Sequence, residues 1–193
     1  MSRREVIGLA GGMCSGKDSW ADFFQQEFGY DHRSTSDVAR AYIRDKDLGE
    51  PTRDLTREVA TQLRATHGTE YLLRQAIEAA DSQRIIISGI YVVPEAMYLK
   101  KVGGSIVSIL ADDKLRFERM AKRAREGELP ELEEYRRLMD NDLNSQHTDQ
   151  RLSDVMDLAD FSIDGSIPIR DRDQCLKIAR NVLTSIEKAR GDV

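Results

Sequence analysis

The chain has 193 residues, of which 40% are apolar and 33% charged, and its formal net charge is −5 at pH 7. A chain of this length is expected to form a single domain over residues 1–193, with a core that needs neither disulfides nor structural metal. Apolar runs such as residues 6–10 and 106–111 are far shorter than the roughly 18 residues of a membrane span. We therefore expect no membrane partner.

The cysteines, the histidines and the net charge narrow the class of protein further. Cys14 and Cys175 are the two cysteines, and the three histidines lie far apart, without the spacing of zinc ligands. This pattern predicts a reducing compartment and hence a cytoplasmic protein. The acidic balance argues against a nucleic-acid polymer as partner. A protein of this charge that handles an anionic substrate must gather its basic residues locally.

Short runs rich in isoleucine and valine alternate along the chain with segments in which apolar residues recur at helical spacing. The runs predict five β-strands, at Glu5–Ala10, residues 30–33, Arg84–Ser88, Ser105–Leu110 and Phe161–Asp164. Helices are predicted at Lys17–Phe28, from Pro51 to His67, after Gly68, around residues 117–124 and around residues 175–186. Strands that alternate with helices favour a parallel sheet covered on both faces. We therefore predict an α/β fold, a three-layer αβα sandwich with a five-stranded parallel sheet.

A glycine-rich loop follows the first predicted strand and precedes the first predicted helix. Its sequence fits the pattern G-x-x-x-x-G-K, with aspartate next, where serine or threonine is usual. Glycines let successive backbone N–H groups turn toward a phosphate, the helix N-terminus adds its positive end, and the lysine adds a cation. A glycine turn with a chance lysine is the simpler alternative. We predict that ATP binds to Gly11, Gly12, Met13, Cys14, Ser15, Gly16, Lys17, Asp18 and Ser19.

With this loop, the chain resembles the P-loop kinases of the nucleoside monophosphate kinase group over nearly its whole length. Within that group it is most similar to adenylate-kinase-like and dephospho-CoA-kinase-like proteins. Gly16-Lys17-Asp18 also resembles the loop of phage deoxynucleoside monophosphate kinases and of animal phosphomevalonate kinase. The resemblance implies a P-loop NTPase-type sheet, a helical acceptor-binding region at about 35–83, a lid region at about 112–150, and ATP and Mg²⁺ as cofactors. We expect a monomer or a homodimer.

Asp18 changes the metal chemistry that the resemblance implies. In the family a hydroxyl at this position binds Mg²⁺, and a carboxylate after a later strand holds the ion through water. In this chain Ser88 ends the predicted strand Arg84–Ser88 and stands where that acid is expected. We infer that Asp18 and Ser88 have exchanged roles and lie near the metal. The alternative is that Asp18 caps a helix and Ser88 merely ends a strand.

The segment from Ser34 to Arg40 resembles the adenylate kinase pattern S-T-G-D-x-x-R, whose threonine and arginine bind the acceptor nucleotide. The resemblance assigns acceptor binding to Thr35, Asp37 and Arg40, and a guanidinium group can donate two hydrogen bonds to one phosphate. Asp37 could instead cap a helix or act as a general base, as the similar aspartate does in dephospho-CoA kinase. The arginine that the family carries near the position of Tyr91 is absent, which weakens a strict adenylate kinase assignment.

Three further arginines share one face of the helix that is predicted to start near Pro51: Arg53, Arg57 and Arg64. This pattern favours a solvated charged face. Contacts with the acceptor are the alternative.

Basic residues also gather between positions 114 and 125. Arg116, Arg119 and Arg123 fall on one side of the predicted helix, and their spacing resembles the R-x-x-R-x-x-x-R pattern of the kinase lid. Arginines that close over a phosphoryl group neutralise charge and exclude water. The resemblance therefore assigns catalysis to Arg119 and Arg123, together with Lys17 and Asp37, and ATP binding to Arg116. A solvated basic helix is the alternative.

Residues 159–166 resemble the family stretch whose loop backbone lies against the donor base, which implies ATP contacts at Gly165 and Ser166. Together these motifs predict a kinase whose substrates are small nucleotides, with a nucleoside or deoxynucleoside monophosphate as acceptor. One alternative is a dephospho-CoA-kinase-like enzyme that phosphorylates a ribose hydroxyl, for which Asp37 would serve as base. Another is a non-catalytic nucleotide-binding switch.

Overall fold

The computed structural model describes residues 4–123, 133, 135, 136 and 152–191, and it confirms the predicted α/β sandwich. The strands are β1 (Glu5–Ala10), β2 (Asp31–Ser34), β3 (Arg84–Ser88), β4 (Ser105–Leu110) and β5 (Phe161–Asp164). The described helices are α1 (Lys17–Phe28), α2 (Thr35–Asp45), α3 (Arg53–His67), α4 (Tyr71–Glu78), α5 (Val93–Lys101), α6 (Asp113–Arg123), α8 (Leu152–Asp157) and α9 (Arg172–Arg190). None of the helices in these ranges is long and apolar enough to cross a membrane.

The five strands form one parallel sheet in the order β2-β3-β1-β4-β5. β1 lies at its centre, where Leu9 pairs with Ser88 of β3 and with Val107 of β4. Because all strands run in the same direction, their carboxyl ends meet at one edge of the sheet. In such sheets this edge is where ligands bind.

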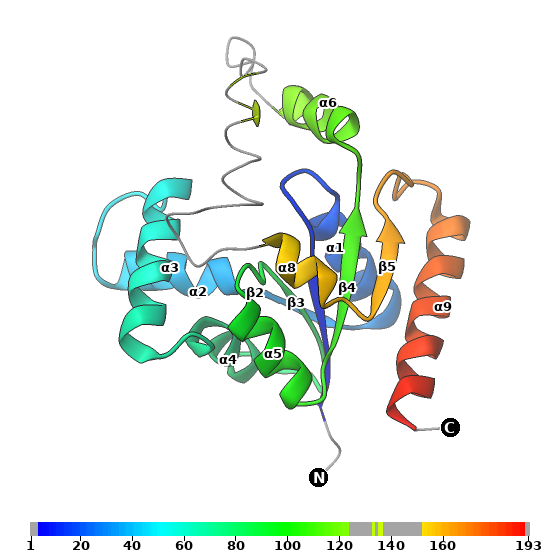
Figure 1. The fold of residues 1–193 in the computed structure, drawn as a ribbon, viewed down its shortest axis with the longest axis horizontal. Helices are drawn as coiled ribbons and strands as arrows, with labels where there is room; N and C mark the ends of the chain where they lie inside the picture. The colour runs from blue at the N-terminus through cyan, green and yellow to red at the C-terminus, as the bar shows by residue number, and fades with distance from the viewer. Residues whose placement is uncertain (1–3, 124–132, 134, 137–151, 192–193) are drawn as a thin grey trace.

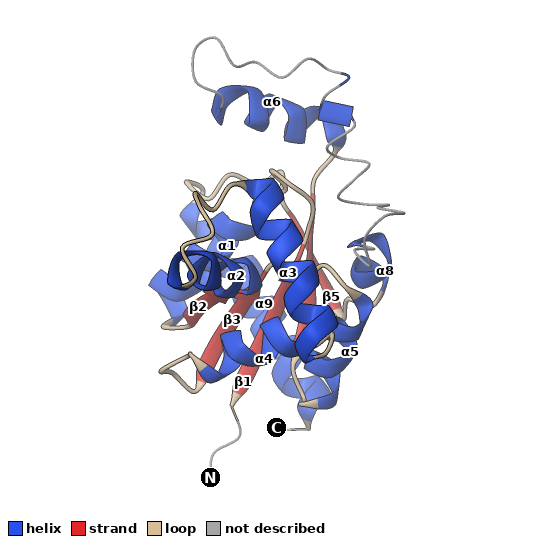
Figure 2. Cartoon of the chain, turned by 90° about the vertical axis from the view of Figure 1, so that its left-hand side faces the viewer, coloured by secondary structure: helices blue, strands red, loops and turns tan. Residues whose placement is uncertain are grey.

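Helices cover both faces of the sheet, as Figures 1 and 2 show. On one face Ile7 and Leu9 pack against the buried aromatic residues of α1 and against α9. On the other face Val6 and Ala10 pack with α4, α5 and α8. Side chains of a strand alternate between its two faces, so a strand buried on both sides needs apolar residues throughout.

The helices α2, α3 and α4 form a smaller cluster beside the sheet, next to β2 and β3. Ile43 of α2 and Leu63 of α3 are buried in its centre with Leu72 of α4. α2 begins where Ser34 accepts a hydrogen bond from the backbone N–H of Ser36. This cluster brings α2 and α3 to the carboxyl edge of the sheet, beside the glycine-rich loop (Figure 2).

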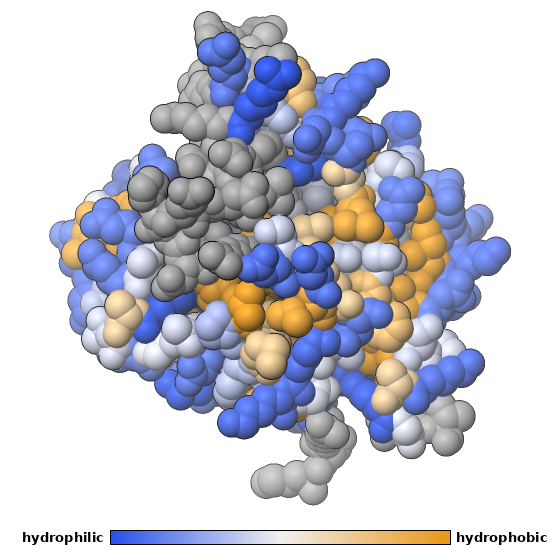
Figure 3. Space-filling view, in the orientation of Figure 1, coloured by the Kyte–Doolittle hydropathy of each residue, from blue (hydrophilic) through white to orange (hydrophobic). Residues whose placement is uncertain are grey.

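Apolar side chains are exposed in the centre of the face shown in Figure 3, in the region of α5 and α8. Among the described residues, Met97 and Val102 at α5 are exposed by 53% and 37%. Exposed apolar residues are common on protein surfaces, and we assign no function to them.

Most helix and strand bounds agree with the prediction, and the differences have local causes. β2 begins at Asp31 rather than at Tyr30, because the backbone N–H of Tyr30 still donates to Phe24 O and closes the end of α1 around Gly29. α5 and α8 were not predicted, and α2 was expected only as part of the helical acceptor-binding region that the resemblance implies. Most of the predicted lid region lies outside the described residues.

Candidate nucleotide and acceptor site

The glycine-rich loop connects β1 to α1 at the carboxyl edge of the sheet. Gly16 has φ +102° and Cys14 has φ +60°, so both lie in the left-handed region. The N–H of Ser15 donates to Gly12 O at 3.1 Å and tightens the turn between them. Alternation of right- and left-handed residues turns successive N–H groups to one side, which forms an anion-binding nest. Gly11 fits closely, because a Cβ there would lie 2.9 Å from Ile109 O.

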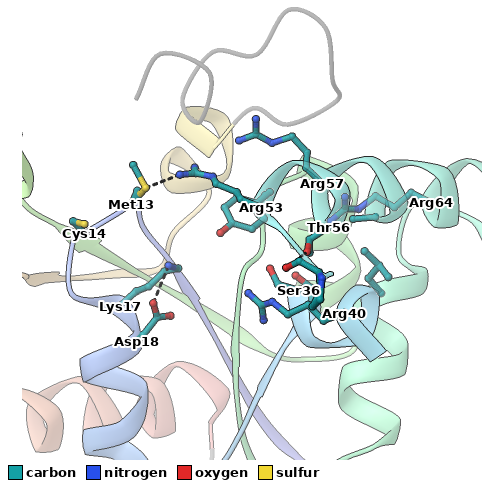
Figure 4. A pocket seen from close by; sticks show the side chains of 15 residues that line it. Met13, Cys14, Lys17, Asp18, Ser36, Arg40, Arg53, Thr56, Arg57 and Arg64 are labelled. Atoms are coloured by element: carbon teal, nitrogen blue, oxygen red, sulfur yellow. Dashed lines mark hydrogen bonds and ion pairs between the residues drawn. The ribbon is translucent and has the colours of Figure 1, made fainter. Parts of the chain in front are cut away.

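Lys17 and Asp18, the first residues of α1, line a cavity of about 310 Å³ (Figure 4). The Lys17 side chain is only 12% exposed, and its Nζ lies 3.4 Å from Asp18 Oδ2. Ser19 follows in the first turn of the helix. The loop, the helix N-terminus and Lys17 thus fit a bound triphosphate chain.

The same cavity reaches α2, and residues predicted for the acceptor line it. Thr35 and Arg40 are among its lining residues, with Ser36 between them in sequence. The buried Thr35 hydroxyl donates to Gly89 O, and Arg40 Nη1 lies 2.5 Å from Asp37 Oδ1. Asp37 is exposed and is not one of the residues described as lining the cavity. Figure 4 shows Arg40 and Ser36 across the cavity from Lys17 and Asp18.

The arginines of α3 complete the wall of the cavity. Arg53, Arg57 and Arg64 all line it. Arg64 is only 7% exposed, so the prediction of a solvated face is wrong for this residue. Its Nε and Nη2 donate to Glu95 Oε1 of α5 at 2.9 and 2.8 Å. Burial raises the pKa of the fully enclosed Glu95 carboxyl, and Arg64 opposes that rise.

The two residues proposed for the metal lie in different surroundings. Asp18 is exposed toward the cavity, whereas Ser88 is 2% exposed and its Oγ lies 2.9 Å from His32 Nε2. His32 Nδ1 in turn lies 3.6 Å from Asp22 Oδ1. No group of three or more histidine, cysteine or carboxylate side chains in the described ranges is arranged to hold a metal. Asp18 suits Mg²⁺ that is bound chiefly through phosphates and water, and the exchange with Ser88 stays a prediction.

The residues predicted for the donor meet on the outer side of the loop. Arg116 Nε donates to Met13 O at 3.0 Å, and Arg119 donates to the carbonyl oxygens of Cys14, Ser15 and Gly165. Both side chains therefore contact the loop backbone, while their predicted contacts with phosphates stay predictions. α6 is described as far as Arg123, and the position of the Arg123 side chain lies outside what the structure describes.

The β5–α9 turn packs directly against the loop. Gly165 N donates to Leu110 O at 2.6 Å, and a Cβ on Gly165 would lie 2.2 Å from Ser15 O. Asp164 Oδ1 accepts a hydrogen bond of 2.8 Å from the Ser166 N–H, and the hydrogen bonding by Ser166 lowers the pKa of Asp164. A second cavity, of about 360 Å³, lies here and is lined among others by Gly12, Ser15, Arg116 and Ser166.

Several residues at this site were not predicted, chiefly His32, Glu95, Tyr91 and Thr56. Tyr91 and Thr56 line the cavity that contains Lys17, and the other two bind predicted residues. Their partners are distant in sequence, so no local pattern marks them.

The sheet order, the loop and the flanking helices define an α/β P-loop fold of the kinase type. The family model described as "AAA domain" matches residues 7–141, and the chain belongs to this family. Among curated proteins, a UPF0200 protein of Staphylothermus marinus is 31% identical over 121 residues, which are 60% of this chain and 61% of that protein. A UPF0200 protein of Hyperthermus butylicus is 26% identical over 174 residues, which are 88% of this chain and 90% of that protein.

Solved structures with the same fold include enzymes of known name. Shikimate kinase from Acinetobacter baumannii in complex with shikimate has a TM-score of 0.61 at 16% identity and covers 94% of each chain. TT1252 from Thermus thermophilus has a TM-score of 0.62 at 15% identity, covering 94% of this chain and 99% of its own. Because the sequence identities are this low, the structural similarity shows a common fold and no more than that.

Proposed function

We propose that the protein is an ATP-dependent kinase that transfers a phosphoryl group to a small anionic acceptor. One observation carries the proposal: a single cavity joins Lys17 and Asp18 of the phosphate loop to the arginine-rich wall of α2 and α3. A donor triphosphate held by the loop would present its terminal phosphate to that cavity. Lys17 and the loop amides would bind the triphosphate, and Mg²⁺ near Asp18 would neutralise charge during transfer.

The charge of the cavity favours an anionic acceptor. Its lining residues include five cations, Lys17, Arg40, Arg53, Arg57 and Arg64, and one carboxylate, Asp18. Glu95 offsets the charge of Arg64, and Asp37 offsets that of Arg40. A cavity wall this rich in cations suits a phosphate monoester, which carries up to two negative charges near pH 7. Together with the resemblance of the Thr35–Arg40 segment, this supports a nucleoside or deoxynucleoside monophosphate as acceptor.

The position of Asp37 favours a phosphate over a hydroxyl acceptor. A hydroxyl needs a general base within hydrogen-bond reach, whereas an ionised phosphate is already a nucleophile. Asp37 is exposed and paired with Arg40. A dephospho-CoA-kinase-like reaction is therefore the second candidate, since it would require Asp37 to leave that pair.

A screen with radiolabelled ATP over ribo- and deoxyribonucleoside monophosphates, with dephospho-CoA as a further acceptor, tests the proposal. Label should pass to a nucleoside monophosphate, and Lys17→Ala should lower the rate about a hundredfold or more, because it removes the cation for the outer phosphates. Lys101→Ala removes an equal charge from the exposed end of α5 and should leave the rate unchanged. Transfer to dephospho-CoA alone would favour the second candidate. ATP binding without transfer to any acceptor would instead indicate a nucleotide-binding switch.

A further inference from the structure

Two arginines of α6 contact the phosphate loop from the side of its carbonyl oxygens. Arg116 Nε donates to Met13 O at 3.0 Å. Arg119 Nη1 donates to Cys14 O at 3.2 Å and to Ser15 O at 3.0 Å. Guanidinium groups thus bind three consecutive carbonyl groups of the loop. Such charge-assisted bonds are among the stronger hydrogen bonds in proteins.

The absence of a side chain at Gly12 leaves space for the first of these arginines, Arg116. Arg116 is 6% exposed, and a Cβ on Gly12 would lie 2.5 Å from its Nη2 and 2.9 Å from its Cζ. Asp113, one turn earlier in α6, lies 3.1 Å from Arg116 Nη1. Gly12 therefore makes room for a guanidinium group against the loop.

The second arginine ties the loop to the neighbouring turn. Arg119 Nη2 donates to Gly165 O at 2.6 Å, and Gly165 packs on the loop backbone at Ser15. Cys14, whose carbonyl Arg119 binds, has φ +60°, which is unfavourable for a residue other than glycine. The hydrogen bonds to the carbonyl groups of Cys14 and Ser15 hold the chain in this conformation.

The chemistry of the peptide group links the two sides of the loop. The carbonyl of one residue and the N–H of the next belong to the same conjugated unit. A cation that binds the carbonyl withdraws electron density and makes that N–H a stronger donor, as in chains of hydrogen bonds that polarise one another. The N–H groups paired with the three bound carbonyls are those of Cys14, Ser15 and Gly16. The Ser15 N–H already donates to Gly12 O, so its gain strengthens the turn within the loop.

We propose that Arg116 and Arg119 are positioning residues, which hold the phosphate loop in its anion-binding conformation and strengthen its amides from the carbonyl side. α6 thereby sets the affinity of the loop for phosphate without itself covering the ligand. This inference rests on the proposed nucleotide-binding function. It assigns to both arginines an action through the backbone rather than direct contact with the transferred group.

The test measures binding of inorganic tripolyphosphate to the full chain by calorimetry, so it depends on the loop and not on turnover. Arg119→Gln should weaken binding about tenfold, because the glutamine amide reaches one carbonyl at most and lacks charge. Arg116→Gln should act in the same direction. Lys122→Gln removes an equal charge from an exposed position of the same helix and should change binding less than about threefold, since solvent and salt screen it.

Amide and carbonyl chemical shifts of the ligand-free protein separate this action from direct contact. In Arg119→Gln the amide protons of Ser15 and Gly16 should move toward weaker hydrogen bonding before any ligand is added, and in Arg116→Gln that of Cys14 should do so. Unchanged shifts and unchanged affinity in Arg119→Gln would overturn the inference, as would equal weakening in Lys122→Gln. Weaker binding with unchanged shifts would show direct contact with the ligand and overturn it too. Arg119 is only half-buried, so this variant keeps the test valid if Arg116→Gln does not fold. Failure of the unchanged protein to bind tripolyphosphate or ATP would refute the nucleotide-binding function itself.

Discussion

Breaking the buried ion pair between Arg64 and Glu95 should destabilise the protein strongly, although Arg64 lines the cavity that contains Lys17. Arg64→Met removes the guanidinium group and leaves a carboxylate that is 0% exposed without its cation. Loss of one member of such a pair costs about 3–5 kcal/mol. For a chain of this size that corresponds to a fall in Tm of about 6–20 °C. Glu95→Leu should have a similar effect, because it leaves Arg64 unpaired.

The double variant distinguishes the pair from two independent contributions. If the two side chains stabilise mainly each other, Arg64→Met with Glu95→Leu should return to within about 1–2 kcal/mol of the unchanged protein, since two apolar side chains fill the space. Additive losses of about 6–10 kcal/mol would refute the assignment of a mutual buried pair. Urea unfolding followed by fluorescence of Trp20, the single tryptophan, measures the free energy of unfolding of the single and double variants. Lys46→Met breaks an exposed pair with Asp45 and should leave the midpoint unchanged.

The pH dependence of the same variants provides a second check. Burial raises the pKa of Glu95 above its ordinary value of 4.5, so the folded state holds the proton more tightly than the unfolded state. Its contribution to stability is therefore full below that value and is lost as the pH rises through the folded pKa. Arg64→Met removes the cation that opposes the shift, so the stability of this variant should fall more steeply than that of the unchanged protein as the pH rises above 4.5. A flat profile in Arg64→Met would contradict the burial of Glu95.

Three further outcomes follow from the site. Gly165→Ala should abolish ATP binding and lower Tm, because the added Cβ would lie 2.2 Å from a loop carbonyl; calorimetry and thermal unfolding measure both, and normal binding would contradict the packing. Cys14, which lines the cavity, should be alkylated and be protected by ATP, whereas Cys175, fully buried in the core with its pKa raised by burial, should react slowly in both states. Mass spectrometry reports each, and equal labelling of Cys14 with and without ATP would contradict its place at the nucleotide. Asp18→Ser should lower Mg²⁺ affinity and turnover, and Ser88→Asp in the same chain should restore part of both if the two share the metal; a coupling near zero would mean that they do not.

The sheet was predictable because its signals are local. Runs such as Arg84–Ser88 and Ser105–Leu110 are short, rich in isoleucine and bounded by turn residues, so burial on both faces leaves a plain trace in the sequence. α8 has only six residues, which is too short for a helical period of apolar residues to be recognised in the sequence. α5, with the sequence VPEAMYLKK, has a weak apolar pattern because Glu95 is buried on its inner side by Arg64. A charged residue in a buried position hides the helix from pattern analysis.

The phosphate loop was predictable for a similar reason, since its residues are consecutive. The arginines of α3 were not, because periodicity shows that they share a face and cannot show what that face meets. Here the apolar face of α3 packs on α2 and α4, and its arginine face closes a cavity that also contains Lys17. The hydrogen bond between Ser88 and His32 likewise joins two strands that become neighbours only when the sheet forms.

Net charge and local charge have opposite signs in this protein, and the local one governs the proposed chemistry. The chain carries −5 overall, which disfavours approach of anions from a distance. At physiological salt the field of exposed charges is screened over about 8 Å, so distant carboxylates contribute little inside the cavity. There the side chains of Lys17, Arg40, Arg53 and Arg57 are close, and Arg64 is fixed by Glu95. The overall acidity of the protein is therefore compatible with the proposed binding of a small phosphorylated acceptor at this cavity.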